Sequence, residues 1–216
     1  MSQIMSPTSA SPAIYQLRVV LRGISPLIWR RLLVPAGTTI AGLHDILQAA
    51  FGWSGEHLHC FTVHGTEYGI CYAGGPIFRD DARRVRLGDL GLRETERFTY
   101  DYDQGALWRH DLRVEGILAG EPGRACPRCT GGRRAGPPED CGGPEAFMEA
   151  SQPHRLLAVM DRVTEIIEEA RADASVLDDC HEELVCLRPW LATGCFDRRA
   201  LNRALAGFGD PTQRAS

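Results

Sequence analysis

The sequence predicts an α+β protein: a β-grasp-like mixed sheet with one packed helix, followed by a C-terminal helical segment. Residues 14–24 and 27–34 alternate apolar and polar side chains and are rich in β-branched residues, which is typical of strands. Apolar residues at helical spacing follow at 40–51, and more alternating segments come after them. Two strands, a crossing helix and further strands form the order from which we expect this fold.

Each predicted element has local start and stop signals. Ser25-Pro26 separates the first two strands, and Thr38 or Thr39 offers the N-cap of the helix, which Gly52 ends as a C-cap glycine. Further strands are predicted at 57–64, 97–103 and 107–118, the last two as a hairpin. We expect a loop at 66–80 and a short strand or single turn at 85–90.

The last third of the chain predicts helices. Ser151 and Pro153 mark a helix start, and Asp197 is a plausible N-cap for the last helix. We therefore divide the chain into a disordered tail (1–13), an α+β core (14–123), a Cys/Pro/Gly/Arg-rich loop (124–143) and a C-terminal helical segment packed on the core (144–216).

The charge of the chain limits which kinds of binding partner the sequence predicts. The net charge of −4 and pI near 6.0 do not predict a broad nucleic-acid surface. All 24 basic residues are arginines, which indicates either composition bias or an arginine-based phosphate surface. Residues 161–183 hold nine acids and two arginines, a net charge of −7, so the rest of the chain carries about +3 (−4 minus −7). This acidic segment is interpreted as a solvated helix face or as a partner surface.

The N-terminus lacks a secretory signal, and no stretch of about 18 apolar residues occurs, so we expect a cytoplasmic protein with reduced thiols. Five of the eight cysteines are then most simply small buried hydrophobic residues: Cys60, Cys71, Cys180, Cys186 and Cys195.

The segment 124–143 is the first candidate site. It is almost free of apolar residues, and we expect neither a regular helix nor a strand there. Cys126, Cys129 and Cys141 come close to a zinc-binding pattern that lacks its second Cys pair, so His57, His59 or His110 would have to complete it. The alternative is a rigid loop with unrelated thiols.

A second candidate site consists of histidines and aspartates on the predicted strands. His57 and His59 with Asp101, Asp103 and His110 could bind zinc or another divalent metal, or perform acid–base chemistry; alternatively they are structural hydrogen-bonding groups.

The arginines of the loop could instead contact nucleic-acid phosphates through Arg128, Arg133 and Arg134. Pairing of these arginines with Glu139 and Asp140 is the simpler interpretation.

Several long motifs resemble the plasmid pRiA4b ORF-3-like family: YQLRVVLRGISPLIWRRLLVP, LHDILQAAFGWSGEHLHCF, FTYDYDQGALWRHDL and PRCTGGRRAGPPEDCGG, with RLGDL and FDRRALNRAL. The resemblance implies an α+β fold with the Cys/Pro/Gly loop as its signature, and a protein associated with plasmids and insertion sequences, some of whose members are labelled resolvase. The chain departs from the family pattern at Ala106 (usually Asp), Gly136 (usually Cys), Glu145 (commonly Trp) and Cys126, an additional Cys.

Residues on the shared motifs define a candidate cleft, in which the Pro-Pro-Glu-Asp corner is expected to pack over the sheet near Trp108 and His110: His57, His59, Tyr102, Asp103, Trp108, His110, Arg128, Pro138, Glu139 and Asp140.

The sequence contains no phosphate-binding glycine loop, GxSxG or HExxH motif and no embedded recombinase serine, so no catalytic residue is assigned. We first expect an accessory binding module of a mobile element whose partners are DNA or other proteins of that element. A small-ligand binding module is the second hypothesis, and a metal-binding protein or metal-dependent hydrolase is the third.

Overall fold

The computed structural model describes residues 13–72, 75–120 and 125–209. The tail predicted at 1–13 lies outside these ranges except for Ala13, which opens the first strand. None of the helices in the described part of the chain is both long and apolar enough to cross a membrane.

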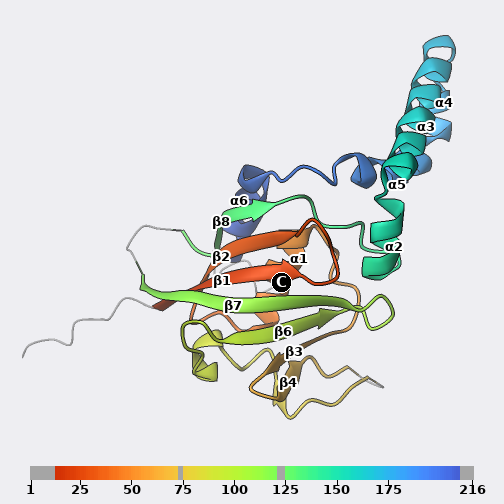
Figure 1. Cartoon of the computed structure of the whole chain (residues 1–216). Helices are drawn as coiled ribbons and strands as arrows, with labels where there is room; N and C mark the ends of the chain where they lie inside the picture. The colour runs from red at the N-terminus through yellow and green to blue at the C-terminus, as the bar shows by residue number, and fades with distance from the viewer. Residues whose placement is uncertain (1–12, 73–74, 121–124, 210–216) are drawn as a thin grey trace, which may run out of the picture.

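An eight-stranded mixed sheet forms the body (Figure 1). Its strand order is β5-β4-β3-β6-β7-β1-β2-β8, and every neighbouring pair is antiparallel except β4 and β5. The α+β prediction is therefore confirmed. The strands are β1 (Ala13–Leu21), β2 (Trp29–Pro35), β3 (His59–Val63), β4 (Thr66–Gly69), β5 (Asp80–Asp81), β6 (Arg97–Tyr102), β7 (Trp108–Ala119) and β8 (Arg128–Arg133).

Helix α1 (Ile40–Phe51) packs on one face of this sheet, which we call the inner face, and lies behind β1 and β2 in Figure 1. The hydroxyl of Thr39 accepts a hydrogen bond from the Gly42 N–H at 3.0 Å, and Gly52 ends the helix in the left-handed conformation at φ 79°. Both predicted caps are confirmed. The apolar residues of α1 and of the inner face form the core, with Leu43, Ile46 and Leu47 fully buried.

The segment 124–143 is not irregular throughout. Arg128–Arg133 forms β8, which pairs with β2 at the edge of the sheet, so the expectation that no strand forms there was wrong. Pairing at an edge needs backbone groups more than apolar side chains. A Cβ on Gly132 would lie 2.5 Å from the Phe196 ring, so a larger residue would not fit beneath it. The predicted loop at 66–80 likewise contains β4 and begins β5 at its end.

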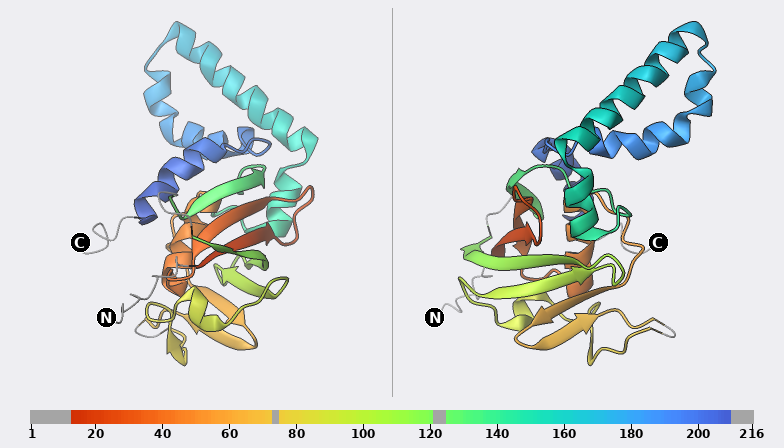
Figure 2. Two further views of the ribbon diagram at one scale, coloured as in Figure 1. Left: turned by 90° about the vertical axis from the view of Figure 1, so that its left-hand side faces the viewer. Right: turned by 45° about the vertical axis from the view of Figure 1, so that its right-hand side comes forward.

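The C-terminal helices divide between the body and a projection. α6 (Arg198–Ala206) buries Leu201 and Leu205 in the core, and its Asn202 side chain bonds the Cys129 N–H and C=O at 2.7 and 3.0 Å. Two long helices project away from the sheet as an arm (Figure 2). The remaining helical elements are α2 (Gly143–Ala150), α3 (Pro153–Ala172), α4 (Val176–Asp179), α5 (His181–Leu191) and the 3₁₀ turns η1 (Leu87–Leu90) and η2 (Gly207–Gly209).

The second face of the sheet, which we call the open face, is turned toward the viewer in Figure 1, with α1 and α6 on its far side. Alternation along the strands sends apolar residues to the inner face and leaves partly exposed polar residues on the open face. In β1, for example, Leu17 and Val19 are fully buried while Arg18 between them is partly exposed.

Candidate functional site

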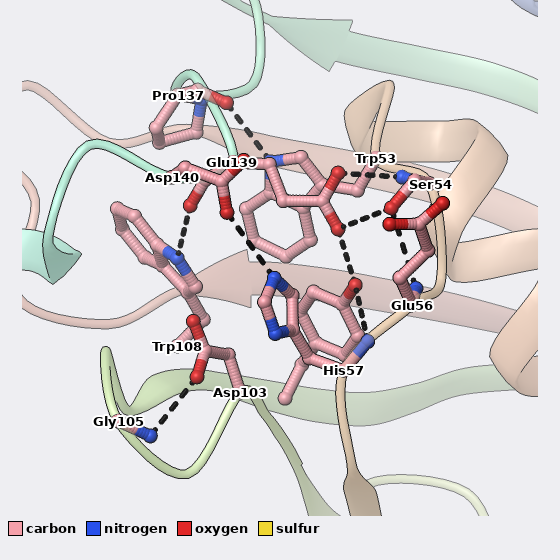
Figure 3. A network of polar contacts seen from close by, with 11 residues as sticks. Trp53, Ser54, Glu56, His57, Asp103, Gly105, Trp108, Pro137, Glu139 and Asp140 are labelled. Atoms are coloured by element: carbon pink, nitrogen blue, oxygen red, sulfur yellow. Dashed lines mark hydrogen bonds and ion pairs between the residues drawn. The ribbon is translucent and has the colours of Figure 1, made fainter.

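The Pro-Pro-Glu-Asp corner packs over the end of the sheet, as predicted (Figure 3). Its backbone accepts two indole hydrogen bonds: Trp53 Nε1 donates to the Pro137 carbonyl at 2.9 Å, and Trp108 Nε1 donates to the Glu139 carbonyl at 3.2 Å. His110 lies next to this corner through an edge contact with the Trp53 ring, with 5.4 Å between ring centroids. Two buried aromatic side chains therefore hold the corner against the body.

The Glu139 carboxylate joins three hydrogen-bond donors. It accepts from the Ser54 N–H at 2.7 Å, from the Ser54 hydroxyl at 3.0 Å and from the Tyr102 hydroxyl. Burial, and then the hydrogen bond to Glu139, raise the pKa of Tyr102 to about 12. The phenol therefore remains protonated near neutral pH and acts as a donor, which suits a structural clamp more than a base or nucleophile.

The other residues of the candidate cleft scatter around this clamp. His57 Nε2 contacts the exposed Asp140 at 3.2 Å, and the Pro138 carbonyl accepts from the Cys141 N–H at 3.4 Å. Asp103 accepts from the Gly105 N–H at 2.9 Å within the β6–β7 turn. Arg128 is not part of this group, because it pairs with Leu33 in the opposite part of the sheet.

His59 and His110 lie on the inner face, in a polar cluster within the core. The His59 ring stacks on His44 at 3.6 Å between centroids, and His44 Nδ1 meets the Tyr100 hydroxyl at 2.7 Å. His110 Nδ1 meets the Tyr100 carbonyl at 3.3 Å. His44 is buried as well, because α1 turns it under β3 and β6.

Burial lowers the pKa of all three histidines: to about 3 at His44, where the neighbouring His59 adds to the effect, and to about 4 at His59 and His110. The rings are therefore neutral near pH 7. His44 and His110 hydrogen-bond to Tyr100, whereas Nε2 of His59 and of His110 is buried without a hydrogen-bond partner in the described part of the chain.

The proposed metal ligands are not gathered. Across residues 13–72, 75–120 and 125–209, no group of three or more His, Cys, Asp or Glu side chains is placed to hold a metal ion. Cys129 is buried and its thiol donates to the Gly131 carbonyl at 3.1 Å, and burial raises the pKa of both Cys129 and Cys141.

The five remaining cysteines are not the buried residues that we expected. Cys71, Cys186 and Cys195 are exposed, while Cys60 and Cys180 are half-buried.

A small pocket of about 220 Å³ lies beside the clamp and is lined in part by His59, Tyr102 and Asp103. Ligand pockets for drug-sized molecules usually measure roughly 300–1,000 Å³. This pocket is therefore smaller than the pockets that usually hold drug-sized ligands.

Sequence reasoning missed a line of arginines that crosses four neighbouring strands of the sheet. The strand registers place Arg97 opposite Arg113, Arg113 opposite Arg18, and Arg18 opposite Arg31. We call these four residues, one each from β6, β7, β1 and β2, the arginine row; all four lie on the open face. Like charges directly opposite each other on neighbouring strands are destabilising.

Only part of this charge is compensated. Arg31 forms a two-bond ion pair with Glu115. In the part of the chain that the structure describes, no carboxylate lies within ion-pair distance of the other three members, Arg18, Arg97 and Arg113. The guanidinium of Arg18 lies over the Trp29 ring, and its Nε is buried without a hydrogen-bond partner.

Neighbouring acids on the open face are already occupied. Asp111 receives two hydrogen bonds from Arg22, at 2.8 and 3.1 Å, and Asp101 receives two from Arg109, at 2.6 and 2.7 Å. The surface beside the row is hollowed by two adjoining depressions of about 190 and 410 Å³, both of which are lined by Arg97 and Asp111.

The three loop arginines proposed for nucleic acid are separated. Arg133 lies opposite Trp29 in the β2–β8 pairing and so belongs to the open face. Arg134 donates to the Pro26 carbonyl at 3.0 Å. Arg128 opens β8 opposite Leu33.

Comparisons with known proteins agree with the motifs. The chain is 35% identical over 146 residues to an uncharacterized protein, y4hQ, of Sinorhizobium fredii, covering 63% of this chain and 71% of that protein. The structure of this chain is similar to the crystal structure of a protein of unknown function, MM3350 from Methanosarcina mazei Go1. The TM-score is 0.62 and the sequence identity is 28%, and the match covers 89% of this chain and 98% of that one. The family described as plasmid pRiA4b ORF-3-like protein matches residues 13–204, and the chain therefore belongs to that family.

Proposed function

We propose that the protein is a nucleic-acid-binding accessory module whose open sheet face contacts the phosphate backbone through the arginine row. The observation that carries this proposal is the alignment of four arginines on adjacent strands, three of which form no ion pair with a carboxylate in the described residues. The family name, which refers to a plasmid, is consistent with such a partner.

The row has a folding cost that a polyanion would offset. Directly opposed like charges cost about 0.2–1 kcal/mol per pair relative to neutral pairs, and the row contains three such pairs. Guanidinium groups also suit phosphate oxygens because their donors form a planar fork.

The geometry favours an extended ligand over a single phosphate. Neighbouring strands lie about 4.8 Å apart, so the four Cα positions span roughly 14 Å across the sheet. One phosphate group cannot reach along that distance, whereas successive phosphates of a nucleic acid can. The contact is local to one face, which reconciles it with the net charge of −4.

A salt series tests the proposal. Three backbone contacts predict a slope of log K against log salt of about −2 for single strands and about −2.7 for duplex, so affinity should fall roughly 15- to 40-fold between about 50 and 200 mM salt. Binding of labelled single-stranded and duplex DNA is measured by fluorescence anisotropy, with heparin as a polyanion that lacks bases and a regular phosphate backbone.

The double variant Arg97→Ala, Arg113→Ala should reduce the magnitude of the slope by roughly 1.4 for single strands and 1.8 for duplex. It should leave stability unchanged or slightly higher, because it removes like-charge pairs. The matched control is Arg203→Ala, which removes an exposed arginine from α6 on the inner side. Absence of binding at low salt, equal slopes for the two variants, or binding to heparin alone would refute the proposal.

A further inference from the structure

The arm, residues 153–191 of α3, α4 and α5, is a helical hairpin, and no other element of the described chain packs on one of its faces (Figure 2). Arg162 joins α3 to α5 through two hydrogen bonds to Glu183, at 2.7 and 2.9 Å, and Ile166 is fully buried between the helices. Stacking of Trp190 on Phe147 of α2 holds the base of the arm, with 5.8 Å between ring centroids.

An apolar stripe runs along the outside of α3. Leu157, Met160 and Ile167 are 57%, 54% and 48% exposed. With Thr164 they follow the 3-4-3 spacing of a heptad seam, so all four lie on one side of the helix. This side of α3 lies next to the side that packs on α5. A third helix bound there would contact the apolar stripe and cover it.

Charge indicates which helix fits there. Asp161 and Glu168 lie one heptad apart on the flank of the stripe, and both are exposed. A second copy of α3 packed antiparallel would bring these acids against their counterparts, which is unfavourable. Residues 1–12, the longest segment outside the described part, contain no arginine or lysine.

We propose that the arm docks an amphipathic helix of another protein whose apolar stripe is flanked by arginine or lysine. The helix lies along Leu157, Met160 and Ile167, and its basic flank pairs with Asp161 and Glu168. The negative charge of residues 161–183, which the sequence left open between a solvated face and a partner surface, then selects the partner. This interaction is independent of the arginine row, because the arm projects away from the open face.

The test uses the full chain and a pair of labelled peptides of about 21 residues, three heptads, with leucine at the two seam positions. One peptide carries arginine and its twin carries glutamate at the flanking positions. Anisotropy titrations should show binding of the basic peptide at least tenfold tighter than that of the acidic twin.

The variant Met160→Asp, Ile167→Asp should weaken binding of the basic peptide at least tenfold. Added carboxylates would strengthen attraction based on charge alone, so this loss reports the apolar stripe. The control Ile77→Asp, at a residue that is 93% exposed and far from the arm in sequence, should leave binding unchanged. Circular dichroism checks that the helices persist.

Three outcomes overturn the proposal: equal binding of both peptides, equal binding by the stripe variant and the wild type, or a concentration-dependent dimer in sedimentation that Met160→Asp abolishes. The last would show that a second copy covers the stripe.

Discussion

Replacing Glu139 by alanine tests whether the signature corner is a structural clamp. The change removes the acceptor for the Tyr102 hydroxyl, whose residue is 1% exposed, and for two donors of Ser54 that water can reach. A buried donor left without a partner costs about 1–3 kcal/mol, and the two exposed donors add roughly 0.5 kcal/mol each. The expected loss of unfolding free energy is therefore about 2–4 kcal/mol, or roughly 5–15 °C in Tm for a chain of this length.

Asp140→Ala is the matched control, because the neighbouring carboxylate is exposed and contacts only His57 among the hydrogen bonds and ion pairs described for it. It should change stability by no more than about 0.5 kcal/mol. Urea unfolding is followed by tryptophan fluorescence, to which Trp53 and Trp108 contribute from the clamp itself. Equal stability losses in the two variants, or a loss below about 1 kcal/mol for Glu139→Ala, would refute the clamp.

Two further predictions concern the same region of the fold. Gly143→Ala should cost more than about 2 kcal/mol of unfolding free energy, because φ is 95° there and a Cβ would lie 2.4 Å from the Ala106 carbonyl oxygen. Gly142→Ala should cost about 1 kcal/mol, because φ is 89° but the nearest neighbour of a Cβ is a side-chain atom at 3.2 Å. Equal urea midpoints for the two variants would contradict this reasoning. The neutral histidines of the core, His44, His59 and His110, have pKa values lowered below those of the unfolded chain, so the unfolded state takes up protons first as pH falls. The free energy of unfolding should therefore be highest above about pH 6.5 and should decrease toward pH 4 by up to about 1.4 kcal/mol per pH unit for each histidine. Urea midpoints that stay constant between these pH values would exclude this coupling of protonation to unfolding.

The clamp could be anticipated because its residues lie on compact motifs. Pro137 to Asp140 follow one another in sequence, and Trp108 stands at the start of a predicted strand. Their meeting required only that the loop fold back on the hairpin, and the indole–carbonyl bond confirms this. The structure does change the interpretation of these residues from a binding cleft to a structural clamp. Glu139 and Tyr102 use their polar groups in hydrogen bonds that hold the corner in place.

By itself the sequence determined the local elements: alternation set the inner and open sides of β1, β6 and β7, and Thr39 and Gly52 set the ends of α1. These signals act within a few residues, so they can be read along the chain. Only the tertiary structure decided what the alternating positions face. Strand register joins Arg18 to Arg113, which is 95 positions away in sequence (113 minus 18), and local periodicity contains no information on that pairing. The arginine row and the burial of His44 both arise from such long-range packing, since burial and cross-strand charge depend on which segment lies opposite.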